Sequence, residues 1–206
     1  MLRLTPEVYR RALDDLAARE TFFARILAQY GPPPLWDRPE GFGTLLHIIL
    51  EQQVSLASAA ACYRKLRERV NPLTPQGFLE LDDAELKLIG FSRQKTAYGR
   101  YLAQALLDKT LDLEALPAME PEQVYNALTS IKGIGRWTSD IYLLMVLQYA
   151  DIWPRGDLAL AKAVQKCLGL PSVPDTRTLE EMAQAWAPWR AAAARLLWFD
   201  YLEGKE

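Results

Sequence analysis

Residues 128–139 read Leu128-Thr-Ser-Ile-Lys-Gly-Ile-Gly-Arg-Trp-Thr-Ser139, and more of the architecture follows from this segment than from any other. A predicted helix ends before the segment and another begins after it. Gly133 and Gly135 bracket Ile134, and glycine permits positive φ and the close approach of another backbone. Ile134 can then pack back into the core, so the pattern predicts a tight hairpin between two helices.

The backbone amides that follow the turn belong to the first turn of a helix. Such amides and the helix dipole favour a phosphate oxygen, and Arg136 and Thr138 lie beside them. Gly133, Gly135, Arg136 and Thr138 are therefore candidates for sequence-independent contact with a nucleic-acid backbone. The same spacing also fits a helix–helix turn that binds nothing, and the spacing alone leaves both interpretations open.

The rest of the chain is also predicted to be helical, so the expected fold class is all-α. Thr5 before Pro6 is a helix start, Ser55 is expected to cap another helix, and Asp82 with Glu85 forms a capping-box pattern. No alternating strand pattern longer than a short fragment is present. Further helices are predicted near residues 20–29, 93–107, 121–130, 136–149, 158–168, 178–186 and 189–202.

The composition excludes several classes of protein. The chain has 206 residues, enough for one domain or for two small lobes around a cleft. No apolar run approaches the roughly 20 residues that span a bilayer, and the N-terminus has no apolar signal-peptide stretch, so we expect a cytoplasmic protein without membrane contact. Two cysteines, Cys62 and Cys167, are too few for a four-cysteine zinc or iron–sulfur site. With His47 as the single histidine, a Ser-His-Asp triad is not expected.

The charge balance is nearly neutral. Lysine and arginine number 24 and aspartate and glutamate 26, which gives a net charge of −2 and argues against a protein that coats nucleic acid through bulk charge. Residues 87–107 nevertheless hold basic side chains, including Arg93 and Lys95, and no acidic one. Arg93 and Lys95 are therefore candidates for phosphate contact, although the segment also fits a solvated helix face.

Five segments, in their order along the chain, resemble segments of the helix–hairpin–helix DNA glycosylase superfamily. The segments are Leu50-Glu-Gln-Gln-Val-Ser55, Gly90-Phe-Ser-Arg-Gln-Lys-Thr-Ala97, Lys132-Gly-Ile-Gly-Arg-Trp-Thr138, Trp153-Pro-Arg-Gly-Asp157 and the stretch from Trp186 to Trp198. The resemblance covers roughly residues 40–202. Within the superfamily the chain resembles the bacterial 3-methyladenine DNA glycosylase II branch, in a short form that lacks a separate N-terminal β-rich domain.

The resemblance implies that residues 1–206 form a single glycosylase domain of two helical lobes around a DNA-binding cleft. The hairpin at residues 128–139 would lie at the edge of this cleft, and the catalytic aspartate would lie in segment 153–162. The resemblance also implies no cofactor for catalysis and no iron–sulfur cluster, with a structural Na⁺ or K⁺ at the hairpin. By position, the main-chain carbonyls that would hold this cation are those of Thr129, Ile131 and Ile134.

An enzyme that excises a base from a duplex must rotate the nucleotide out, because the glycosidic bond is hidden in the base stack. A side chain must then fill the gap, and residues 50–55, where an apolar helix meets a polar turn, are the expected place. The DNA-contacting candidates in this segment are Leu50, Gln52, Gln53 and Ser55. Leu50 fits a plain core position equally well.

The expected base pocket is aromatic, because N-alkylated purines carry positive charge and an indole face attracts such a cation by about 0.5–2 kcal/mol. The pocket candidates are Trp137, Trp198 and Tyr142. By resemblance, Trp198 occupies the position of a tryptophan that lies next to the catalytic aspartate. Tyr142 lies one residue past Ile141, where close relatives often have a tyrosine, and this step turns a helical side chain by about 100°.

Asp157 is the catalytic candidate. Cleavage of a glycosidic bond builds positive charge on the sugar, which a nearby carboxylate stabilises, and the same group can orient the attacking water. Asp157 also has the position of an N-cap for the helix at 158–168, and both roles can hold. Superfamily members that also cut the strand have a lysine at the position of Trp137, and tryptophan has no nucleophilic amine, so a monofunctional enzyme is expected.

The expected function is therefore removal of alkylated purines, of the 3-methyladenine and 7-methylguanine type, from double-stranded DNA to leave an abasic site. We expect a monomer that associates with the bacterial nucleoid while it acts. Three alternatives stay open: a glycosylase for another base lesion, a non-enzymatic helix–hairpin–helix DNA-binding module, and a helical interaction protein without a DNA role.

Overall fold

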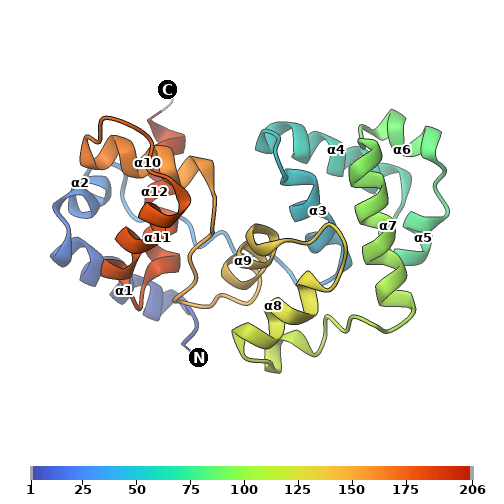
Figure 1. Cartoon of the computed structure of the whole chain (residues 1–206), viewed down its shortest axis with the longest axis horizontal. Helices are drawn as coiled ribbons and strands as arrows, with labels where there is room; N and C mark the ends of the chain where they lie inside the picture. Colours follow the sequence, from blue (N-terminus) through green and yellow to red (C-terminus); the bar gives the residue numbers. More distant parts are fainter. Residues whose placement is uncertain (1, 205–206) are drawn as a thin grey trace. The chain divides into compact units, whose positions relative to one another are not determined.

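The computed structural model describes residues 2–204, and this part of the chain is built from helices. Over these residues it contains twelve α-helices and two short 3-10 helices, and its extended pairing is one isolated bridge between Arg3 and Tyr149. The all-α prediction is confirmed. No helix within this range is long and apolar enough to cross a bilayer. The chain divides into two compact units (Figure 1).

The first unit, here called the terminal unit, combines the residues up to Asp37 with those from Leu143 onward. Its elements are α1 (Pro6–Arg19), α2 (Thr21–Tyr30), α10 (Leu158–Leu168), α11 (Thr176–Ala183), the 3-10 helix η2 (Gln184–Trp186) and α12 (Arg190–Glu203). α12 is the central helix of this unit and packs against α1, α2 and α10 (Figure 1). Residues 191–194 of α12 are four consecutive buried alanines, whose small side chains allow the neighbouring helices to pack closely.

The second unit, here called the central unit, runs from Arg38 to Tyr142. Its elements are α3 (Phe42–Glu51), α4 (Leu56–Arg69), α5 (Pro75–Leu79), α6 (Asp83–Ile89), α7 (Arg93–Leu107), the 3-10 helix η1 (Leu116–Ala118), α8 (Pro121–Thr129) and most of α9 (Arg136–Met145). α3 forms the core of the unit, because α4 and α7 pack against it and residues 45, 46, 48 and 49 are fully buried.

The predicted helix starts are present. Thr5 Oγ1 and Ser55 Oγ each accept a hydrogen bond of 3.2 Å from the backbone amide three residues further on. Asp82 accepts from the Glu85 amide at 2.8 Å while the Glu85 carboxylate accepts from the Asp82 amide at 3.0 Å, which completes the capping box. These bonds satisfy amides that have no partner inside their own helix.

Two features differ from the sequence prediction. α9 ends at Met145 rather than near residue 149, because the chain turns at Gln148, which has a φ of 56°, and the Tyr149 amide returns to the Leu143 carbonyl. The short helix α5 was not predicted, since five residues are too few to display a helical period. Its Thr74 cap followed by Pro75 was the available signal.

The largest fully buried side chain among the described residues is that of Arg195, on α12. Its guanidinium donates to the main-chain carbonyls of Leu35 (2.6 Å), Ala191 (3.0 Å) and Leu144 (2.8 Å) and to the side chain of Gln148 (2.8 Å). Burial lowers the pKa of this guanidinium. Arg195 thereby joins the segment after α2, the end of α9 and α12 inside the terminal unit.

Candidate active site

Asp157 precedes α10 in the terminal unit, and its carboxylate is held by two donors. Oδ1 accepts a hydrogen bond of 2.9 Å from the Leu160 amide and one of 3.2 Å from the Trp198 indole. The prediction that Asp157 caps this helix is therefore confirmed, and the structure brings Trp198 beside it. The half-buried side chain borders a hollow of about 230 Å³, lined also by residues 173–176. The carboxylate is thus oriented by the protein at the edge of this hollow.

Three tryptophans of the terminal unit, Trp153, Trp186 and Trp189, are buried, whereas Trp36 of the same unit is half-buried. Trp198 is also mostly buried, at 8% exposure, so its indole edge orients Asp157 while little of its ring faces solvent.

The hairpin between α8 and α9 has the geometry that its glycines predicted. Gly133 has a φ of 99°, and the first carbon of any side chain there would lie 2.1 Å from the ring of Tyr98, so only glycine fits. Ile134 is buried and its amide donates to the Ile131 carbonyl at 3.0 Å. At Gly135, in contrast, an added side chain would meet no atom of the described residues within 4 Å. Gly135 therefore leaves open space on the outer side of the turn, where another molecule can approach the backbone.

Two predicted phosphate contacts at the start of α9 prove to be engaged inside the protein. The side chain of Thr138 is buried, at 1% exposure, so it is not available to a DNA backbone. The Arg136 guanidinium lies 3.5 Å from the centroid of the Tyr125 ring and 3.5 Å from a carboxylate oxygen of Asp140. The hydroxyl of Tyr125 also donates to Asp140. Arg136 remains 44% exposed, so it can present charge at the surface but is restrained by these partners.

The loop between α3 and α4, residues 52–55, is here called the wedge loop. Leu50, which precedes it, is 1% exposed and belongs to the core, so the prediction that it contacts DNA is wrong. Gln53 is exposed and has a left-handed φ of 57°, and Val54 is exposed at 45%. Ser55 caps α4, as described above. Val54 was missed as a candidate, although an apolar residue between two polar ones in a predicted turn was the available signal.

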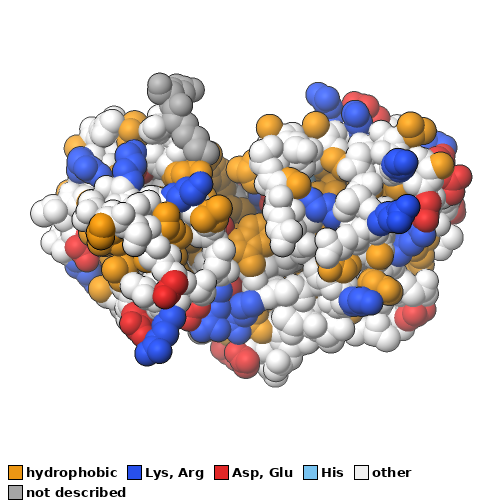
Figure 2. Space-filling view, turned by 45° about the horizontal axis from the view of Figure 1, so that its top comes forward, with side chains coloured by type: hydrophobic (Ala, Val, Ile, Leu, Met, Phe, Trp, Pro, Cys, Tyr) orange, Lys and Arg blue, Asp and Glu red, His pale blue; other side chains and the backbone are white. Residues whose placement is uncertain are grey.

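The two basic candidates of α7 have different environments. Arg93 is exposed in the first turn. The ammonium of Lys95 instead donates to the Leu50 carbonyl, and burial lowers its pKa, so Lys95 is a tether inside the unit rather than a phosphate contact. On the face drawn in Figure 2, Lys and Arg side chains are dispersed among acidic and uncharged ones and form no continuous stripe.

The central unit carries the other two pocket candidates. Trp137 is half-buried at the start of α9. Tyr142 is fully buried, and burial raises the pKa of its hydroxyl, which has no hydrogen-bond partner among the described residues. Its ring therefore has no exposed face, which corrects the prediction that it forms part of a base pocket. The physical reason is that this part of α9 is buried on every side, since Ile141 and Leu143 are also at most 3% exposed.

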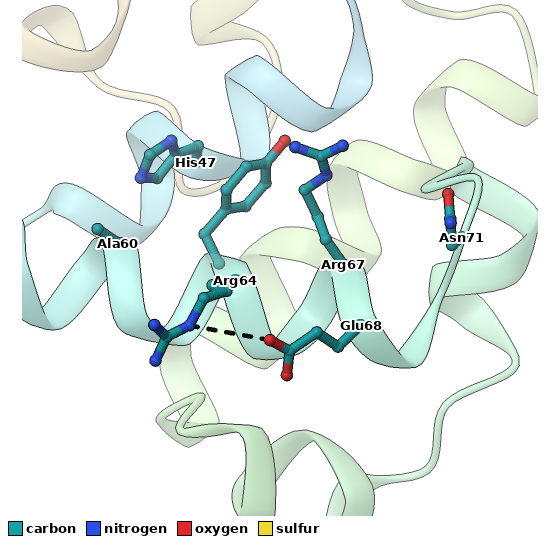
Figure 3. Close-up of a pocket in the computed structure, with 7 residues that line it drawn as sticks. His47, Ala60, Arg64, Arg67, Glu68 and Asn71 are labelled. Carbon is teal, nitrogen blue, oxygen red and sulfur yellow. Dashed lines mark ion pairs between the residues drawn. The ribbon is translucent and has the colours of Figure 1, made fainter.

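His47 is a packing residue in the central unit. Its ring stacks on Tyr63 with centroids 4.2 Å apart, and its Nε2 lies 3.7 Å from Glu51, which also accepts two bonds of 2.9 Å from Arg38. Burial lowers the pKa of His47. A hollow of about 460 Å³ lies beside it, but Arg64 and Arg67 extend away from one another there, so this hollow lacks a convergent set of ligands (Figure 3).

Comparison with known proteins gives matches along most of the chain. The family described as "HhH-GPD superfamily base excision DNA repair protein" matches residues 46–188. The chain is 28% identical to the alkylbase DNA glycosidase-like protein mag2 of Schizosaccharomyces pombe, over 92% of each chain. It is 26% identical to DNA-3-methyladenine glycosylase 1 of the same organism, over 93% of this chain and 85% of the relative.

Among solved structures, the chain resembles the Schizosaccharomyces pombe 3-methyladenine DNA glycosylase (Mag1) in complex with abasic DNA. The TM-score is 0.84 at 26% identity, and the alignment covers 91% of this chain and 95% of that one. The likeness therefore extends over both units and not only over the hairpin.

Proposed function

Because the chain belongs to the HhH-GPD superfamily of base excision DNA repair proteins, we propose that it is a DNA glycosylase that removes alkylated purines from double-stranded DNA. Its substrates are bases of the 3-methyladenine and 7-methylguanine type, and its product is an abasic site. The observation that carries this proposal is the Asp157 carboxylate, which two donors orient at the edge of a hollow. The names of the relatives support the substrate class.

Asp157 supplies the charge that the reaction requires. As the glycosidic bond breaks, positive charge develops on the sugar, and a carboxylate fixed in advance stabilises it without reorganisation. The same carboxylate orients a water molecule for attack on the sugar. An alkylated purine leaves as a base that is already cationic, so the reaction needs little acid assistance, and His47 is packed away from any such role.

Aromatic side chains recognise the damaged base, and the hairpin binds the DNA backbone. Trp137 presents the more exposed indole to the cationic base, and Trp198 keeps Asp157 in place. The open backbone at Gly135 and the amides of the first turn of α9 bind a phosphate of the DNA strand. Exposed Gln53 and Val54 fill the gap that the rotated nucleotide leaves.

A structural Na⁺ or K⁺ at the hairpin is part of this proposal. The main-chain carbonyls of Thr129, Ile131 and Ile134 would hold it, and oxygen ligands of this kind suit a hard cation. The Ile131 carbonyl accepts one hydrogen bond and keeps a second lone pair for the ion. No other cofactor is proposed, and we propose that the protein acts as a monomer in the cytoplasm.

The proposed enzyme is monofunctional, and this predicts that it has no strand-cutting activity of its own. Trp137 lacks an amine, and Lys132 of the hairpin lies with its ammonium 5.3 Å from the centroid of the Tyr101 ring. Incubation with an abasic duplex and borohydride is expected to trap no covalent adduct. An adduct that forms with the parent protein and disappears in a Lys132→Ala variant would contradict this assignment.

A non-enzymatic DNA-binding module is the second candidate, favoured by the capping role of Asp157, which Asp82 and Asp175 share on other helices. The two functions differ in the fate of the base. The discriminating experiment is incubation with duplex DNA that contains one 7-methylguanine, followed by precipitation of the DNA and chromatography of the bases left in solution. A glycosylase releases free 7-methylguanine, whereas a module binds the duplex and leaves the base attached to it.

A further inference from the structure

The side chain of Gln52 points into the protein and not outward from the wedge loop. Its Nε2 donates to the Gly133 carbonyl at 2.9 Å and to Thr138 Oγ1 at 2.9 Å. An amide nitrogen carries two hydrogens, so both donors of this side chain are used. Both acceptors belong to the hairpin and the first turn of α9. Gln52 therefore bridges the wedge loop to the proposed phosphate-binding turn.

The N-terminal part of α7 supports the same arrangement from a second side. Lys95 donates to the Leu50 carbonyl just before the loop. The ring of Tyr98 occupies the space that a side chain at Gly133 would need, and its hydroxyl accepts a bond of 2.8 Å from Gln94. One helix thus contacts both the last turn of α3, just before the wedge loop, and the hairpin, and Gln52 links the wedge loop directly to the hairpin.

This bridge explains the conformation of the next residue. Gln53 has a left-handed φ of 57°, which is unfavourable for a residue with a side chain and persists only where its surroundings determine it. The bonds of Gln52 fix the backbone immediately before Gln53, and the Ser55 cap fixes it two residues later. Between these fixed points Gln53 and Val54 project into solvent.

We propose that Gln52 is a positioning residue, which holds the wedge loop at a set place relative to the hairpin so that insertion into the duplex and the grip on its backbone occur together. This proposal rests on the proposed glycosylase function. A loop ordered in advance loses little conformational entropy on insertion, whereas a detached loop must be ordered at that moment. Gln52 itself then makes no contact with DNA through its amide nitrogen, and Gln53 and Val54 are the inserting residues.

The test uses the full chain and a duplex in which a tetrahydrofuran abasic analogue lies beside 2-aminopurine, whose fluorescence increases when it is unstacked. Gln52→Leu is expected to raise the dissociation constant for this duplex about 5- to 100-fold, the range for the loss of two hydrogen bonds, and to leave the affinity for undamaged duplex nearly unchanged. Thr138→Val removes one acceptor at a residue that is 1% exposed, and is expected to weaken binding in the same selective way. The double variant is expected to be no weaker than Gln52→Leu alone.

Gln104→Leu is the matched control, because this exposed glutamine of α7 also donates from its amide, to Asp108 at 2.8 Å, and lies outside both the loop and the hairpin. It is expected to match the parent protein. A direct contact between Gln52 and DNA would make Thr138→Val silent, and that result overturns the proposal. The proposal is also overturned if Gln52→Leu loses affinity equally for damaged and undamaged duplex and melts at a lower temperature. The role of Gln52 would then be structural. A parent protein that gives no increase in fluorescence contradicts the proposed function itself.

Discussion

Asp157→Asn is expected to slow single-turnover excision of 7-methylguanine by about 10²–10³-fold, the usual cost of losing one preorganised electrostatic contact. Asparagine keeps the size of the side chain and an oxygen that can accept from the Leu160 amide and the Trp198 indole. Only the negative charge is lost. The melting temperature and the affinity for lesion DNA are therefore expected to stay near those of the parent protein.

Asp82→Asn provides the matched control, because Asp82 caps α6 with a bond of 2.8 Å to the Glu85 amide and has no proposed part in the chemistry. Both variants are expected to melt like the parent, and only Asp157→Asn is expected to excise the base more slowly. Excision by Asp157→Asn within a few-fold of the parent rate would remove Asp157 from the mechanism and leave it a helix cap.

Arg195→Met is expected to cause the largest loss of stability of any single substitution considered for this chain. The change removes the donors to three main-chain carbonyls and to Gln148, all in a position with no exposed surface. Buried acceptors left without partners cost about 1–3 kcal/mol each, and partial relaxation brings the expected total to about 3–5 kcal/mol. A domain of this size should then melt about 6–20 °C lower, measured by calorimetry.

The control for Arg195→Met is Arg177→Met, on α11 of the same unit. Arg177 pairs with Glu181 at 2.9 Å, but their side chains are 89% and 64% exposed, and such a pair contributes about 0–1 kcal/mol. Its melting temperature is expected to stay within about 4 °C of the parent. A similar result for Arg195→Met would mean that the four acceptors find new partners and that Arg195 does not hold the terminal unit together.

Local signals in the sequence predict most of the helices and the position of the hairpin. A capping residue, a proline at the first helical position and a terminal glycine act within a few residues, and the caps at Thr5, Ser55 and Asp82 lie where these signals place them. The glycine pattern of the hairpin is equally local, although the reason for Gly133, the ring of Tyr98, comes from another helix.

The direction of a polar side chain is less predictable, because its partner is often distant in the sequence. Gln52 bonds to residues 81 and 86 positions away, and Lys95 bonds to a carbonyl 45 positions away. Both were expected at the DNA surface because of their residue type. Thr138 and Leu50 were also expected to contact DNA, but both side chains are buried. Burial depends on which elements pack over a residue and not on its neighbours in the chain.

The central claim is that this chain releases alkylated purines as free bases, and the most direct measurement is chromatography of the bases released from matched duplexes under single-turnover conditions. The duplexes carry one 7-methylguanine, one hypoxanthine or one 8-oxoguanine at the same position. The expected result is stoichiometric release of 7-methylguanine, with an abasic strand that stays intact until alkali is added, and little release from the other two. Binding of the 7-methylguanine duplex without release of the base, or faster release of an uncharged lesion base, would contradict the account.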